Sequence, residues 1–124
     1  MRRLSLLPAA AALVLFAGVA EAHPKLVSAS PAPNAVVAKP ARLELHFSER
    51  LMPKLSGADL MMTGMKGMNH APIKVAATSA VAADGRTLIV RPRAPLGAGR
   101  YSLAWHVVSA DTHRIVGNYA FTVK

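Results

Sequence analysis

The sequence predicts an all-β protein, a small antiparallel Greek-key β-sandwich or barrel of immunoglobulin-like type. Two observations carry this prediction. First, segments in which apolar and polar residues alternate recur along the chain, for example at 42–47 and 118–123, and a period of two is typical of strands that bury one face. Second, turn residues separate these segments, and about seven short strands in roughly 100 residues are typical of a sandwich.

The strands follow one another without an internal repeat or a linker. An extended segment at 26–30 runs into a proline-rich turn, Asp84 and Gly85 form a turn ahead of another strand, and a loop with two prolines and two glycines covers 92–99. We expect strands at 26–30, 42–47, 58–62, 73–76, 87–91, 100–107 and 118–123.

Alternation also assigns faces to the aromatic and imidazole side chains. Trp105 lies on the apolar side of its strand, so we interpret it as a core residue and not as a ligand platform. His46 and His106 fall on the polar faces of their strands, where exposure to solvent is expected. We therefore leave both histidines out of the candidate sites.

The first 22 residues have the composition of a cleaved signal peptide. Two arginines precede an apolar run over 4–19, and Ala20 and Ala22 supply the small residues that a signal peptidase accepts. The run is shorter than the roughly 20 residues of a membrane-spanning helix and is interrupted by a proline, so we favour cleavage over a retained anchor. We expect residues 1–22 to be removed and residues 23–124 to form one exported domain.

Composition narrows the classes of function. The chain has 15 Lys and Arg residues against 6 Asp and Glu residues, a formal net charge of +9. These basic residues are scattered and are not interleaved with exposed aromatic residues, and export argues against nucleic acid as a partner, so we expect no nucleic-acid binding. The chain has no cysteine, which excludes disulfides and thiolate ligands and leaves methionine sulfur as the soft donor.

Cleavage after residue 22 would make His23 the first residue and a chelating group. Its α-amino nitrogen and its imidazole can bind one metal ion once both have lost their protons. Pro24 has no backbone N–H, so the following peptide cannot supply another nitrogen. The remaining ligands must then come from elsewhere in the fold.

Asp111 and His113 are the candidates for these ligands. Residues i and i+2 of an extended chain project to the same side, so both side chains can converge on one ion while Thr112 points away. Together with His23 they would supply three nitrogens and one carboxylate oxygen, which suit tetragonal Cu(II) or Ni(II), and copper heads the affinity order. Taken alone, the same residues would be explained better as a surface turn capped by Asp111.

Four of the six methionines lie within eight positions, Met61 to Met68, and His70 follows them. Methionines three residues apart could form a helical stripe in a core, but the glycines among them and the proline that follows favour turns. We expect a flexible loop that displays thioethers and one imidazole and binds a soft metal ion, Cu(I). Met61 can instead face the core.

The motifs resemble those of the CopC-type periplasmic copper-binding proteins. The resemblance rests on 23–28, 45–49, the Met/Gly/His stretch, 107–113, and Gly117 with Asn118, and it covers essentially all of the expected exported domain. It implies a Cu(II) site and a Cu(I) site at opposite ends of the sandwich. The implied ligands are His23, Asp111 and His113 for Cu(II), and Met62, Met65, Met68 and His70 for Cu(I).

Three positions qualify the resemblance. Family members with the full methionine site usually have a further methionine where this chain has Ile73, so the site either keeps three sulfurs with His70 or uses Met61 in addition. The second histidine of the Cu(II) site is commonly followed by proline, whereas Arg114 follows it here. Glu49 lies where a further carboxylate has been proposed in some members.

We therefore expect a periplasmic, monomeric copper-binding protein that carries copper in resistance and homeostasis and is not an enzyme. The resemblance implies a CopD-type inner-membrane protein or a multicopper oxidase as the partner. The alternative is a copper oxygenase with an N-terminal histidine brace, similar to lytic polysaccharide monooxygenases. The six aromatic residues of the chain are few for a sugar-binding face, and Asp111 would occupy the position that oxygen needs. A plain immunoglobulin-like structural module would leave His23 and the methionine cluster unexplained.

Overall fold

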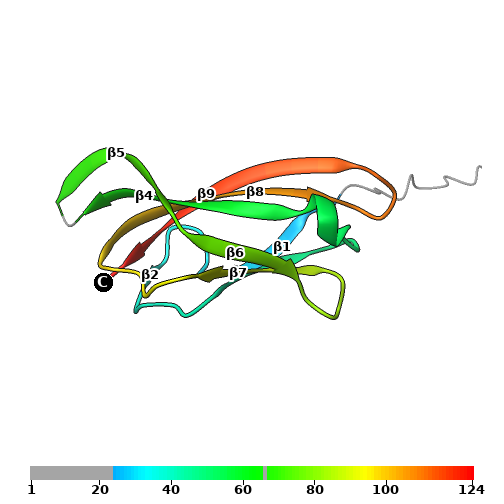
Figure 1. Cartoon of the computed structure of the whole chain (residues 1–124), viewed down its shortest axis with the longest axis horizontal. Helices are drawn as coiled ribbons and strands as arrows, with labels where there is room; N and C mark the ends of the chain where they lie inside the picture. Colours follow the sequence, from blue (N-terminus) through cyan, green and yellow to red (C-terminus); the bar gives the residue numbers. More distant parts are fainter. Residues whose placement is uncertain (1–23, 66) are drawn as a thin grey trace, which may run out of the picture.

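The structure is a computed structural model that describes residues 24–65 and 67–124, so the expected signal peptide and His23 lie outside the described residues. In these residues, nine strands form two sheets, and one short 3-10 helix lies between β3 and β4 in the chain (Figure 1). The elements are β1 (Leu26–Ser30), β2 (Val36–Val37), β3 (Leu43–Phe47), η1 (Pro53–Leu55), β4 (Gly57–Met65), β5 (Met68–Val75), β6 (Ala77–Val81), β7 (Thr87–Pro92), β8 (Gly99–Val108) and β9 (Arg114–Val123). Nothing helical within the described ranges has the length or hydrophobicity to cross a membrane.

The two sheets form the predicted β-sandwich. One sheet has the strand order β1-β3-β7-β6 and the other has the order β2-β9-β8-β4-β5. Neighbouring strands are antiparallel except β2 and β9, which run parallel. The chain crosses between the sheets at Ala76, the one residue between β5 and β6, and Figure 1 shows these strands as an almost continuous ribbon. The all-β prediction is confirmed.

The core lies between the sheets and is built from the alternating apolar residues. Leu103 and Val107 of β8 are fully buried, as are Leu43 and Leu45 of β3 in the other sheet. Burial of each such side chain contributes about 1.5–3 kcal/mol. Trp105 is 9 % exposed and belongs to the same cluster, as predicted.

The structure corrects several predicted boundaries. The methionine segment was expected to be a flexible loop, but β4 continues to Met65 and β5 begins at Met68, so most of the segment is in strands. β9 begins at Arg114 and not at 118, because its pairing with β8 extends to Val108. The short β2 and the edge strand β6 were not predicted, and the small residues of β6 carry little apolar alternation.

Candidate metal sites at the two ends of the sandwich

Asp111 and His113 meet in the turn between β8 and β9. The His113 Nδ1 atom lies 3.1 Å from Asp111 Oδ2, and each side chain is about half exposed. The sequence argument assumed an extended chain at these residues, but the chain forms a turn here. Thr112 has a φ of 74°, in the left-handed region, so a tight turn brings the flanking side chains together.

Ser109 holds this turn from inside. It is 1 % exposed, and its hydroxyl donates a hydrogen bond to Asp111 Oδ1. The backbone N–H of His113 donates to Ser109 Oγ at 3.3 Å, and the Ser109 N–H donates to the His113 carbonyl at 2.9 Å. The sequence analysis missed Ser109, although its place two residues before Asp111 is a common arrangement for a turn hydroxyl.

The same contacts set the charge of the site. The hydrogen bond from Ser109 is the main cause that lowers the pKa of Asp111. Desolvation opposes it, and the hydrogen bonds and charge of His113 lower the pKa further. Asp111 is therefore a carboxylate at neutral pH. A carboxylate beside an imidazole offers an oxygen and a nitrogen donor to a divalent cation.

The beginning of the described chain lies at this end of the sandwich. Pro24 is fully buried, and Lys25 pairs with Ser48 through two bonds of 2.9 Å, one from the Lys25 N–H to Ser48 Oγ and one from the Ser48 N–H to the Lys25 carbonyl. Two residues further on, the Arg50 carbonyl accepts a 2.8 Å hydrogen bond from the Ala110 N–H. The segment that follows β3 thus connects the start of β1 to the turn that contains Asp111.

Residues 24–65 and 67–124 contain no group of three or more His, Asp or Glu side chains close enough to hold a metal ion. Glu49, which lies in the neighbouring segment, therefore does not complete such a group with Asp111 and His113. Arg114, which stands where proline is common in the family, is exposed to solvent.

The methionine cluster lies at the opposite end of the sandwich (Figure 1). Gly64 pairs with Arg100 at the start of β8, whereas the Asp111 turn follows the last residue of β8. Met65 and Met68 are direct cross-strand partners, 55 % and 66 % exposed. The two strands bring these thioethers to the tip of one hairpin, which we call the methionine hairpin (57–75).

The other two methionines of the cluster lie on opposite faces of β4. Met62 packs against the core, and a Cβ placed on Gly99 would lie 2.6 Å from the Met62 methyl carbon. Met61 pairs with Ser102 on the face that points away from the core, so the alternative that Met61 faces the core is wrong. Ile73, at the position of the expected fifth ligand, is the direct partner of Met62 and is 56 % exposed.

His70 lies in the irregular part of β5, where the pairing with β4 shifts register. Its Nδ1–H donates a 2.7 Å hydrogen bond to the Ala71 carbonyl, since a carbonyl can only accept. Its Nε2 atom is buried and has no hydrogen-bond partner among the described residues. The neutral ring therefore carries its proton on Nδ1, which leaves Nε2 as the nitrogen with a free lone pair.

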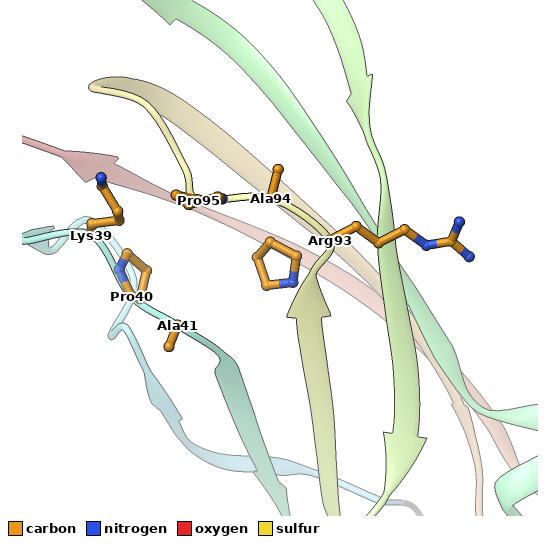
Figure 2. Close-up of a pocket in the computed structure, with 7 residues that line it drawn as sticks. Lys39, Pro40, Ala41, Arg93, Ala94 and Pro95 are labelled. Atoms are coloured by element: carbon orange, nitrogen blue, oxygen red, sulfur yellow. The ribbon is translucent and has the colours of Figure 1, made fainter.

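Two other features, His46 and a hollow in the surface, contribute no ligands to these sites. The His46 side chain is 43 % exposed on the polar face of its strand, and its Nδ1–H donates to Thr87 Oγ1 at 2.9 Å, because the Thr87 hydroxyl itself donates to Asp84. A hollow of about 300 Å³ between the start of β3 and the end of β7 is lined by proline, alanine, Lys39 and Arg93. Figure 2 shows the Arg93 side chain extending away from Lys39. This hollow contains none of the donor types that bind copper.

Comparisons with known proteins identify the family of the chain. Residues 26–124 match the family model of the CopC domain. The chain is 55 % identical over 103 residues to "Copper resistance protein C" of Xanthomonas campestris pv. juglandis, covering 83 % of this chain and 81 % of the relative. It is 46 % identical over 124 residues to the protein of that name from Pseudomonas syringae pv. tomato, covering 100 % of this chain and 98 % of the relative. The crystal structure of PcoC, a methionine-rich copper resistance protein from Escherichia coli, superimposes with a TM-score of 0.76 at 51 % identity, covering 82 % of this chain and 99 % of that one.

Proposed function

Because the chain belongs to the CopC family of copper resistance proteins, we propose that it binds copper in the periplasm and passes the ion to a partner without catalysing a reaction. The observation that supports this function is the separation of two donor sets of different hardness on one sandwich. A carboxylate and an imidazole lie at one end, and thioethers with an imidazole lie at the other. The partner is a CopD-type inner-membrane protein or a multicopper oxidase, and the protein acts as a monomer.

The Cu(II) site consists of Asp111, His113 and the N-terminal His23. Removal of residues 1–22 exposes the α-amino group of His23, which then binds together with its own imidazole. The bonds between Lys25 and Ser48 support this assignment, since they hold the chain two residues after His23 at the end where Asp111 lies.

The Cu(I) site consists of Met62, Met65, Met68 and His70. Thioethers are soft ligands and suit Cu(I) better than Cu(II). The tautomer of His70 supports its role, because the hydrogen bond to Ala71 leaves Nε2 as the donor nitrogen. Two sites of different hardness would let the protein accept copper in either oxidation state and release it by ligand exchange.

The Cu(II) site is tested with protein purified from the periplasm, whose first residue is determined by N-terminal sequencing. A matched variant carries one alanine inserted between Ala22 and His23, which displaces the chelating amine by one residue. We expect tight Cu(II) binding and a tetragonal EPR spectrum for the chain that begins at His23, and loss of both in the variant. Equal binding by the two proteins would refute the role of the His23 amine.

The Cu(I) site is tested with the double variant Met65→Leu/Met68→Leu, which keeps the size and hydrophobicity of two exposed side chains and removes their sulfur. We expect weaker Cu(I) binding and unchanged Cu(II) binding. Loss of both ions to the same extent would refute the assignment of separate sites. Oxygen consumption by the reduced, copper-loaded protein would instead favour an oxygenase.

A further inference from the structure

We propose that Ser109 is a positioning residue for the Cu(II) ligands. This inference rests on the proposed function, because it concerns the same Asp111 and His113. Ser109 does not offer a metal ligand of its own. Its buried hydroxyl holds the carboxylate and the main chain of the two residues that do.

The hydrogen bonds of Ser109 can be accounted for completely. A hydroxyl has one proton to donate, and the negatively charged Asp111 Oδ1 is its strongest acceptor. The His113 carbonyl is also within reach, at 3.3 Å, but it already accepts the Ser109 N–H at 2.9 Å. The hydroxyl oxygen in turn accepts the His113 N–H at 3.3 Å. One side chain thus touches both candidate ligands.

The burial of Ser109 makes these bonds difficult to replace. Only 1 % of the Ser109 surface is exposed, so water has little access to replace its hydroxyl in these hydrogen bonds. A buried group that loses its hydrogen-bond partner is left unsatisfied, so truncation at this position has a larger effect than the same truncation at the surface.

The backbone of the turn also needs such support. Thr112 lies between the two ligands with a φ of 74°, which is unusual for a β-branched residue and persists only where the surroundings enforce it. The Thr112 N–H donates to the Ser109 carbonyl at 2.8 Å. Ser109 therefore fixes the turn through its carbonyl, its N–H and its hydroxyl, before any ion arrives.

The test compares wild-type protein with Ser109→Ala, which removes the hydroxyl, and with Ser109→Thr, which keeps it. Ser79→Ala is the control for an exposed serine that makes the same number of main-chain hydrogen bonds. The Ser79 hydroxyl also makes two main-chain hydrogen bonds, both with Ala58 and both remote from the turn. All variants are made in the full chain and purified from the periplasm, and Cu(II) affinity is measured by competition with a chelator.

We expect Ser109→Ala to weaken Cu(II) binding about 10–100-fold, the usual effect of losing a residue that orients a metal ligand. Its Cu(II) EPR parameters should shift, whereas Ser109→Thr and Ser79→Ala should keep the wild-type spectrum and affinity. Wild-type affinity and spectrum in Ser109→Ala would overturn the proposal, as would an equal loss in Ser79→Ala.

A measurement on the metal-free protein separates this proposal from the proposed function. The exposed His113 should have a protected amide in hydrogen exchange, because its N–H donates to Ser109 Oγ, and Ser109→Ala should abolish the protection. An unprotected His113 amide in the wild type would overturn the positioning role, even if Ser109→Ala did not fold. Absence of Cu(II) binding by the wild type would instead refute the proposed function.

Discussion

Gly117→Ala is expected to force Trp105 out of its place in the core. Gly117 of β9 is the direct partner of Trp105 of β8, and the indole covers the glycine. A Cβ at position 117 would lie 2.3 Å from Trp105 Cζ2, 2.7 Å from Cε2 and 2.9 Å from Cη2. The ring is also held by Phe47, against which it packs in a T-shaped arrangement with ring centroids 5.2 Å apart.

The size of the effect follows from two opposing terms. Overpacking a filled core costs about 1–3 kcal/mol, and three contacts this short place the variant at the upper end of that range. Replacing glycine with alanine restricts the unfolded chain and returns up to about 1 kcal/mol. The net loss of unfolding free energy is about 2 kcal/mol, which lowers the melting temperature of a domain of this size by roughly 10 °C.

The assay is denaturant unfolding followed by the fluorescence of Trp105, the single tryptophan of the chain. Gly97→Ala is the control, because a Cβ at position 97 would meet no atom within 4 Å. We expect Gly97→Ala to unfold at the wild-type denaturant concentration or slightly above it. An unfolding midpoint of Gly117→Ala equal to that of Gly97→Ala would refute the packing argument.

Two further predictions concern the methionine hairpin and an unpaired hydroxyl. Ile73→Met places a thioether opposite Met62 and should raise Cu(I) affinity by about tenfold. The control Ile73→Leu, of similar size without sulfur, should leave the affinity unchanged. Equal Cu(I) affinities of the two variants would argue against a fourth sulfur ligand at this position. Burial raises the pKa of Tyr119 from 10.0 to about 12. The unfolded chain therefore ionises first, and stability that is complete below pH 10 is lost as the pH rises from 10 to 12. Tyr119→Phe should remove this alkaline loss. It should also stabilise the fold by about 1 kcal/mol at neutral pH, because the Tyr119 hydroxyl is buried without a hydrogen-bond partner among the described residues. Tyr101→Phe, which loses a bond to the Gly97 carbonyl, should destabilise instead, and thermal unfolding at pH 7 and 11 checks both variants.

The sequence by itself determined the fold class, the core and the family. Alternation along β8 places Leu103, Trp105 and Val107 on one face, and these residues are buried in the structure. This works because strand periodicity is local and half-buried strands must show it. Asp111 and His113 were also identified as a pair, but the extended chain on which that prediction rested is wrong, because the chain turns at Thr112.

The way in which they meet was decided by the tertiary structure. The turn depends on the conformation of Thr112 and on the burial of Ser109, and burial depends on the strands packed around it. The same holds for the hairpin register that places Met65 opposite Met68 and Ile73 opposite Met62. Local sequence identified these residues as donors or neighbours, but only pairing between strands could assign their partners.

The position of the chain start relative to the Asp111 turn is likewise a tertiary property. It rests on hydrogen bonds from Lys25 to Ser48 and from Ala110 to Arg50, which join residues far apart in the sequence. No local pattern encodes such contacts, because they form only when β1, β3 and the turn after β8 reach the same end of the sandwich. The sequence thus supplied the donor residues of the two proposed sites, and the packing of the two sheets decided which of these donors lie together.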